Sequence, residues 1–332
     1  MSVQKSQRLT QEAAASLDAH TDVTGLRQQV SPQLKAARRR EFLRRNAIAY
    51  LFLLPAIVLF FVFSIYPIIY SFITSFQYTN LISPPQWVGL RNFQYALRDT
   101  LFVTTWKNCF FFLLWGIPGF ILPIVLAIII NELRWLWGDI FRFVYYLPGI
   151  LPPIVIYLLW QWLYEPDKYG LLNAVLYSLH FPLLGFLDNP STVIPSIVLI
   201  GVWSGTGGGM LFYLAALQGL SSHLYDAAEM DGAGILARFW YITLPQMRVL
   251  IMYQLLFFVM GAFQTFEAPF VLTGGGPMNA SVTPVLEVYQ YGLVFHDFGA
   301  ANALSLIIFA VLLVLSILYI RVGSRVTGLG RF

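Results

Sequence analysis

Long apolar runs alternate with short polar segments from residue 47 onward. Six of these runs come near or exceed the roughly 20 residues that an α-helix needs to cross a bilayer. They extend approximately over 48–76, 106–131, 142–164, 192–219, 249–271 and 300–321. The runs are continuous, whereas the strands of a membrane β-barrel alternate in segments of about ten residues. The pattern therefore predicts an all-α membrane protein with six transmembrane helices.

Prolines inside several predicted spans indicate how these helices pack. Each proline removes a backbone donor and kinks its helix. Neighbouring helices must then cover the freed carbonyls, which favours a packed bundle over isolated anchors. The prolines concerned are Pro55, Pro67, Pro118, Pro123, Pro148, Pro152 and Pro153.

The composition agrees with a membrane protein and excludes some kinds of site. Of the 332 residues, 58% are hydrophobic and 11% are charged, against about a quarter charged in a typical globular domain. The single cysteine, Cys109, lies in an apolar run, cannot form a disulfide within the chain and is expected to pack as a small hydrophobe. The four histidines are scattered without ligand spacing, so no metal site is predicted.

The placement of basic residues predicts the orientation of the chain. Nine of the 20 Lys and Arg residues lie before position 46. Residues 1–46 are therefore read as a basic, disordered cytoplasmic head that anchors the topology or lies on anionic lipid, with no nucleic-acid role. With this end inside, four basic residues remain outside, at Arg91, Arg98, Lys107 and Lys168. Both termini are then cytoplasmic, with a six-span domain over 47–325 and a short tail over 326–332.

The polar segment 221–247 between the fourth and fifth spans has the pattern of two short helices. Ser221 and Ser222 suit an N-cap, and carboxylates follow where the helix dipole favours them. Gly232 is expected to end the first helix. A second helix over 235–243 is expected to place one apolar face on the bundle and to end at Pro245. Orientation counting puts this segment in the cytoplasm.

The same segment resembles the EAA motif of permease subunits of bacterial ATP-binding-cassette importers. That pattern is Glu-Ala-Ala, three residues, Gly, nine residues, Ile, one residue and Leu-Pro. This chain keeps every spacing, with Asp in place of the first Glu. The matching residues are Asp226, Ala227, Ala228, Gly232, Ile242, Leu244 and Pro245.

Other segments narrow the resemblance to the carbohydrate-uptake group of the maltose-type first membrane subunit. They are Tyr66-Pro67, Val88 to Phe93, Trp203, Leu211 to Gly219 and Leu272 to Pro277. The resemblance covers roughly 47–325 and implies the type I importer permease fold in the bacterial inner membrane. It also implies that 221–247 couples ATPase closure to alternating access.

The resemblance further implies which partners the chain has and which of the subunits binds ATP. The expected partners are a second homologous permease, two cytoplasmic ATPase subunits, an extracytoplasmic solute-binding protein and membrane lipid. The chain has no Gly-x4-Gly-Lys-[Ser/Thr] loop, so ATP and Mg belong to the ATPase and this chain is not an enzyme. The expected substrate is an oligo- or disaccharide.

Polar and aromatic residues within spans are candidates for the substrate pathway, because such groups are costly in a membrane and are often functional. Gln264 and Glu267 lie three residues apart and are expected to share a helix face. The candidates are Trp160, Gln161, Trp203, Tyr213, Gln264 and Glu267. Helix-helix hydrogen bonds or an interfacial aromatic belt are the alternative roles.

Two further functions stay open from the sequence. The same machinery could import a glycerol-phosphate-type or acidic sugar. An ion-coupled secondary carrier is the alternative of another class, although no inverted repeat or charged relay is evident in the spans.

Overall fold

The computed structural model describes residues 46–327 except 48, 81 and 134. The chain divides into two compact units, 1–70 and 71–332, and each is described by itself. The predicted basic head lies outside the described residues except for Asn46. The predicted tail lies outside them except for its first two residues.

The first apolar run forms one helical span, Ala49–Thr74, of mean hydropathy 2.5, as predicted. A π-helical turn, η1 (Phe61–Ile65), precedes α2 (Tyr66–Thr74). Pro67 follows this turn by two residues. In the wider π-helical turn, the carbonyl of the residue four positions before the proline lies farther from the proline ring. The helix therefore continues past a residue that would otherwise break it.

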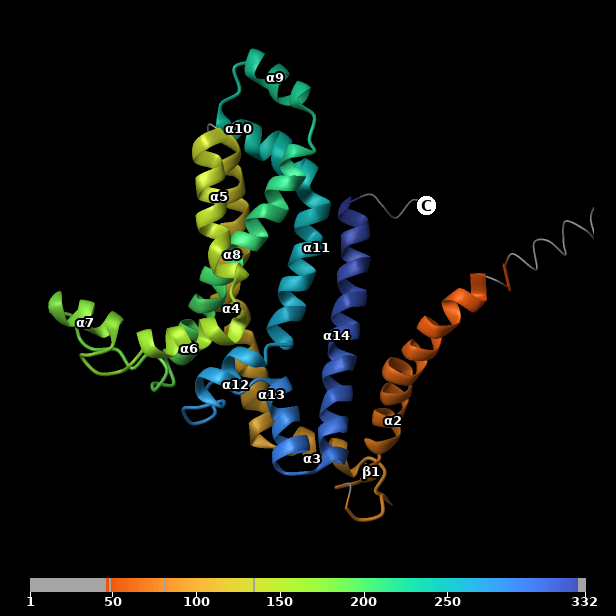
Figure 1. Cartoon of the computed structure of the whole chain (residues 1–332). Coiled ribbons are helices and arrows are strands. Elements are labelled where there is room, and N and C mark those ends of the chain that lie inside the picture. Colours follow the sequence, from red (N-terminus) through yellow and green to blue (C-terminus); the bar gives the residue numbers. More distant parts are fainter. Residues whose placement is uncertain (1–45, 48, 81, 134, 328–332) are drawn as a thin grey trace, which may run out of the picture. The chain divides into compact units, whose positions relative to one another are not determined.

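The second unit is built on long helices that pack side by side (Figure 1). α4 lies along α8, α5 covers α8, and α11 contacts both α4 and α14. A Cβ added at Gly207 of α8 would lie 2.0 Å from the Tyr145 carbonyl oxygen of α5, so this close approach requires glycine. The bounds of these helices are α4 (Thr100–Glu132), α5 (Trp135–Ile150), α8 (Val193–Gln218), α11 (Leu244–Phe263) and α14 (Phe298–Thr327).

The predicted third span is not one straight helix. α5 and α6 (Pro153–Leu163) meet at a bend of 93°. Pro152 and Pro153 cause the break, because the first has extended backbone (φ −56°, ψ 135°) and the second starts a new helix. In the described part of the chain, five helices are long and apolar enough to cross a membrane. The number rises to six if this bent pair counts as one span.

The predicted fifth span also differs from the structure. The helical run starts at Ile235 and passes through α10 (Ile235–Arg238) and the π-helical η2 (Phe239–Thr243) into α11. Pro245 therefore does not end a helix as predicted. It stands two residues after a π-helical turn, as Pro67 does. The run then breaks at 264–266, and α12 (Glu267–Thr273) follows.

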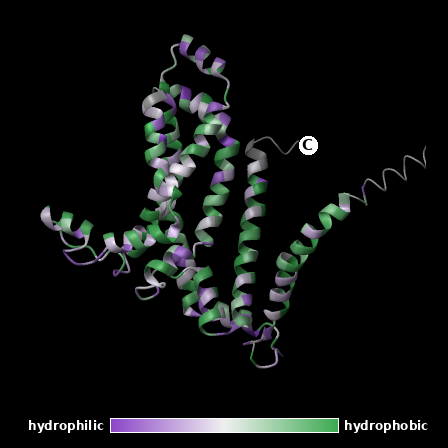
Figure 2. Ribbon diagram, in the orientation of Figure 1, coloured by the Kyte–Doolittle hydropathy of each residue, from purple (hydrophilic) through white to green (hydrophobic). Residues whose placement is uncertain are grey.

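Short elements gather at the two ends of the second unit. α9 (Ser222–Met230) stands at one end, beyond α10 (Figure 1). At the opposite end, β1 (Gln77–Tyr78) pairs antiparallel with β2 (Gln86–Trp87). The same end carries α3 (Arg91–Arg98), α7 (Leu171–Ser178), α13 (Pro284–Tyr289) and η3 (Gln290–Val294). Apolar residues follow the long helices and hydrophilic ones are frequent in α9 (Figure 2), as expected for a membrane body with polar ends.

Candidate functional site

α9 ends in a backbone cap that depends on Gly232. The Gly232 N–H donates to the Glu229 carbonyl at 3.0 Å, and the Ala233 N–H donates to the Ala228 carbonyl at 2.8 Å. This pair of bonds is a Schellman motif, which needs a left-handed residue at its centre. Gly232 supplies it with φ +77°, so the predicted helix-ending role of this glycine is confirmed.

The outer face of α9 is open. Asp226 and Ala227 are exposed, and Ala228 is half-buried. Within the described ranges, no hydrogen bond or ion pair engages the Asp226 carboxylate. Ser221 stands at the N-cap position as predicted, although its side chain makes no cap bond. A carboxylate beside two alanines thus forms a low, accessible surface.

Two contacts tie α9 to the helix that follows. Arg238 Nη1 lies 3.4 Å from Glu229 Oε2. The Tyr225 hydroxyl and Thr243 Oγ1 share a hydrogen bond of 3.0 Å, and Thr243 is buried. These contacts hold α9 to α10 and η2, which continue as one helical run into α11.

The remaining motif residues belong to that run and not to α9. Ile242 and Leu244 are half-buried, and Pro245 is exposed. Met247, the next buried position, packs in a cluster with Met210 and Leu217 of α8. The motif therefore combines an exposed helix with the helix that anchors it.

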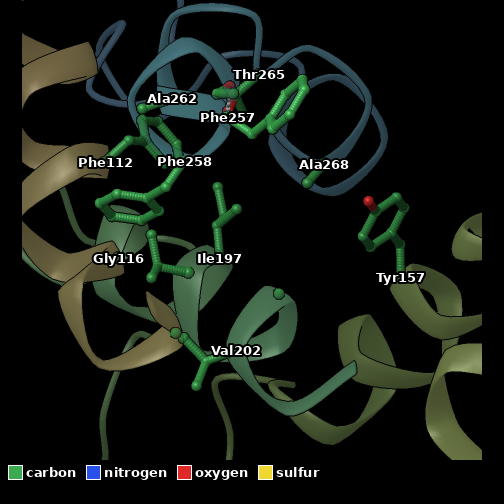
Figure 3. A pocket seen from close by; sticks show the side chains of 14 residues that line it. Phe112, Gly116, Tyr157, Ile197, Val202, Phe257, Phe258, Ala262, Thr265 and Ala268 are labelled. Atoms are coloured by element: carbon green, nitrogen blue, oxygen red, sulfur yellow. Dashed lines mark hydrogen bonds between the residues drawn. The ribbon is translucent and has the colours of Figure 1, made fainter. Parts of the chain in front are cut away.

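A cavity of about 380 Å³ lies within the second unit, between α4, α6, α8, α11 and α12 (Figure 3). Aromatic and small side chains line most of it. Tyr157 faces it from α6, and Thr265 lies at its edge where the fifth span breaks. No Asp, Glu, Lys or Arg is among its lining residues. Gly201 and Gly261 line it at positions where an added Cβ would meet nothing within 4 Å.

Buried polar contacts fasten the segment between α12 and η3 to α4. Asn108 Nδ2 donates to the carbonyls of Asn279 at 2.8 Å and Val282 at 2.9 Å. Thr283 Oγ1 donates to the Thr265 carbonyl at 2.6 Å. Because Thr265 lines the cavity, this segment is connected directly to the cavity wall.

Glu287 is the buried acid of this segment. It is fully buried, and its Oε2 lies 2.9 Å from Thr105 Oγ1, whereas Oε1 has no partner in the described part of the chain. Burial raises the pKa of Glu287 from 4.5 to about 7, the Thr105 hydrogen bond opposes this, and the nearby Asp99 charge adds to it. Asp99 in turn accepts a hydrogen bond from the Tyr291 hydroxyl. No sequence pattern marks this residue, because its burial comes from packing across the chain.

Metal chemistry finds no support in the described residues. None of their His, Cys, Asp and Glu side chains form a group of three or more that could hold a metal ion.

The sequence model of the family described as "binding-protein-dependent transport system inner membrane component" matches residues 119–328. The chain belongs to this family. It is a multi-pass inner-membrane protein and a transport component.

Two curated relatives of this inner-membrane component match over most of its length. It is 32% identical to the arabinooligosaccharides transport system permease protein AraP of Bacillus subtilis (strain 168), covering 87% of this chain and 92% of the relative. It is 31% identical to the trehalose/maltose transport system permease protein MalF of Thermococcus litoralis, covering 84% and 95% respectively.

A solved structure shares the fold. It is that of a bacterial alginate ABC transporter in complex with an alginate pentasaccharide-bound periplasmic protein. The match has a TM-score of 0.79 and 24% identity, and it covers 86% of this chain and 97% of the other. This likeness confirms the predicted importer-permease fold.

In this inner-membrane component the structure brings Trp160 and Trp203 together but does not gather the six predicted pathway residues at one site. Trp160 packs between Tyr164 and Trp203, with ring centroids at 5.1 Å and 5.6 Å. Tyr213 is buried in the cluster near the α9 end. Gln161 lines a separate hollow. None of the six lines the cavity.

Gln264 and Glu267 do not share a helix face as predicted. α11 ends before Gln264, whose side chain reaches back to the Met260 carbonyl at 3.4 Å. Glu267 begins α12 after the break and is exposed. The spacing rule failed because it assumes one continuous helix.

The residues that do line the cavity carried weaker sequence signals. Tyr157 and Thr265 each lie within four residues of a predicted candidate, and the glycines of α8 and α11 are small residues of the kind that is common where membrane helices pack closely. A search for small residues facing one another could have found them. Their convergence depends on the α6 bend and the break at 264–266.

Proposed function

We propose that this chain is the permease subunit of an ATP-driven, binding-protein-dependent importer of oligo- or disaccharides. The observation that carries the proposal is α9, a glycine-capped helix that stands at one end of the second unit with Asp226 and Ala227 exposed and Ala228 half-buried. A connector that served only to join two spans would not need this face. The arabinooligosaccharide and trehalose/maltose permeases to which the chain is similar support carbohydrate as the substrate.

The α9 face is the contact for a cytoplasmic ATPase. In the six-span topology expected from the sequence, 16 of the 20 Lys and Arg residues belong to the side predicted to be cytoplasmic, which supports a cytoplasmic position for both termini and α9. Two ATPase subunits carry ATP and Mg and act on this chain and on a second, homologous permease. Asp226 and Ala227 make the contact, while Gly232, Ile242, Leu244 and Pro245 fix the helix that presents it.

The cavity is the route of the sugar. Phe112, Phe257 and Phe258 offer aromatic faces, and Tyr157 and Thr265 offer hydroxyls. Sugars pack their apolar faces on aromatic rings, and a lining without charge suits a neutral ligand. A solute-binding protein delivers the sugar at the α13 end. ATP-driven closure and the docked protein must each favour one state for the cavity to change its opening.

Filling the cavity tests the route. Gly201→Leu and Gly261→Leu add volume where the Cβ meets open space, so the helices should fold while sugar uptake falls at least about tenfold. Leu199→Phe is the matched control. It adds volume to α8 two residues away, on the opposite side of the helix, where Leu199 is exposed.

The measurement is uptake of radiolabelled sugar by proteoliposomes that contain the complete importer, with ATP hydrolysis recorded in parallel. Uptake that persists in both glycine variants would remove the cavity from the route. Uptake driven by an ion gradient without ATP would replace the importer by a secondary carrier.

A further inference from the structure

A second hollow, of about 430 Å³, lies beside the cavity at the α13 end of the second unit. Gln161 of α6 forms one side of it, and Asp188, from the segment before α8, forms another. The end of α12 and the turn that follows it, within residues 271–277, form the third side. Three segments far apart in sequence therefore meet around one space, and the proposed function leaves it without a role.

The turn that forms one wall is held rigidly. Gly274 and Gly275 have φ of +60° and +95°, which glycine adopts without strain. Thr273 Oγ1 lies 2.9 Å from the Pro269 carbonyl and 2.7 Å from Ser281 Oγ, and the fully buried Ser281 donates to the Gly276 carbonyl at 2.8 Å. The wall is thus preorganised, which lowers the entropic cost of binding a ligand against it.

Two of the polar side chains that line the hollow are available to a ligand. Gln161 and Asp188 are exposed, and in the described part of the chain neither side chain has a hydrogen-bond or ion-pair partner. A carboxylate accepts hydrogen bonds, and an amide both donates and accepts. Together they complement the paired hydroxyls of a sugar. No Lys or Arg lines the hollow, so its fixed charge is that of Asp188.

The hollow and the cavity follow one another along the seam between α6 and α12. On α6, Tyr157 lines the cavity and Gln161, one turn later, lines the hollow. On α12, Ala268 lines the cavity and Leu272, one turn later, lines the hollow. Leu272 also belongs to a core cluster with Phe112 and Ile197, which line the cavity. An apolar cluster therefore adjoins both spaces.

We propose that this hollow is an outer carbohydrate subsite, in which Gln161 and Asp188 bind sugar hydroxyls next to the cavity and Asp188 disfavours acidic sugars. The inference rests on the proposed function, since it takes the ligand to be a carbohydrate. It adds a second contact with the sugar and a preference for neutral substrates.

Binding of two sugar probes to the complete importer in lipid nanodiscs tests the subsite. The probes are maltotriose, which is neutral, and trigalacturonate, which has the same length and three carboxylates. Saturation-transfer NMR, without ATP or binding protein, reports the affinity of each. We expect the wild-type importer to bind maltotriose more tightly than trigalacturonate, since the carboxylates of the uronate meet Asp188.

Two variants give opposite signatures. Gln161→Ala should weaken maltotriose binding about fivefold, the loss expected for one hydrogen bond. Asp188→Asn should weaken maltotriose binding less and should strengthen trigalacturonate binding about fivefold, because the like charge is removed. Asp167→Asn is the matched control, because Asp167 is an exposed acid of the same outer segment that lies outside the hollow. It should change neither affinity more than twofold.

Three results would overturn the subsite: no saturable binding of maltotriose by the wild type, equal affinity for the two probes, or unchanged affinities in both variants. The uptake assay with Gly261→Leu keeps this separate from the proposed function. An importer whose uptake depends on the cavity while Gln161→Ala and Asp188→Asn are neutral would retain the function and lose the subsite.

Discussion

The two segments that join long helices at opposite ends of the second unit are stabilised in different ways. Residues 221–234, around α9, have an exposed outer face and two side-chain contacts to the following helix. Residues 279–291, around α13, are largely buried and are fastened to α4 by Thr105 and Asn108.

The difference lies in how each end is held, locally at α9 and by long-range buried contacts at α13. The α9 segment takes its shape from local backbone caps, so its outer surface stays exposed. The helical run that follows it continues into α11, which lines the cavity, and so connects α9 to the cavity wall. The α13 segment takes its shape from long-range buried contacts, which tie it to α4. Weakly packed elements are the ones that proteins use for movement.

Gly232→Val would break the α9 segment and should have the largest effect. A β-branched residue is strained at φ +77°, so the turn is lost and the exposed face is misplaced. We expect sugar uptake to fall at least about tenfold while the protein still inserts. Gly234→Val is the control in the same turn, since Gly234 has φ −69° and open space for a Cβ. Normal uptake by Gly232→Val, measured in proteoliposomes, would contradict the coupling role of α9.

Glu287→Gln probes the buried end and should have the next largest effect. The folded pKa, about 7, is above the ordinary value of 4.5, so the folded state binds more protons than the unfolded state between these values. The free energy of unfolding must therefore fall as pH rises through this window, by on the order of 3 kcal/mol in total. The amide that replaces the carboxyl group cannot ionise. In this variant most of the decrease in the free energy of unfolding with rising pH should therefore be absent.

Thermal unfolding in nanodiscs between pH 5 and pH 8.5 measures the difference. Glu165→Gln changes an exposed carboxylate of the same end and should leave the pH dependence as in the wild type. Equal pH dependence in the wild type and Glu287→Gln would show that Glu287 is not the buried titrating group.

Glu229→Gln should have the smallest effect and sharpens the comparison. The Glu229 side chain is 73% exposed in its pair with Arg238, and exposed ion pairs contribute less than about 1 kcal/mol. Sugar uptake should change less than about twofold. A loss as large as that of Gly232→Val would mean that the ion pair, and not the backbone cap, positions α9.

The fold was predictable where a simple period governs the chain. Continuous apolar length located the spans approximately, and the conformational freedom of glycine located Gly232 as a helix end. The errors lie at prolines and at helix breaks. Pro245 was expected to stop a helix, and the π-helical turn before it absorbs the proline. The kink predicted at Pro152 and Pro153 is confirmed, as a bend of 93° in the third span.

The site was less predictable than the fold. Asp226, Ala227 and Ala228 could be predicted because their motif is a local pattern, and their coupling role stays a prediction. Tyr157 and Thr265 could not, because they become neighbours only when the α6 bend and the break at 264–266 bring them to one cavity. Whether Trp160, Trp203 and the other candidates touch substrate stays a prediction.

The sequence by itself determined the membrane class, the approximate spans and the motif that the chain presents at one end. These features follow from local composition and spacing, which do not depend on the tertiary contacts of the segment. Only the tertiary structure decided where a cavity opens, that Glu287 is buried beside Thr105, and that Gln161 and Asp188 face one hollow. Burial and proximity depend on contacts between residues distant along the chain, and no local period encodes them.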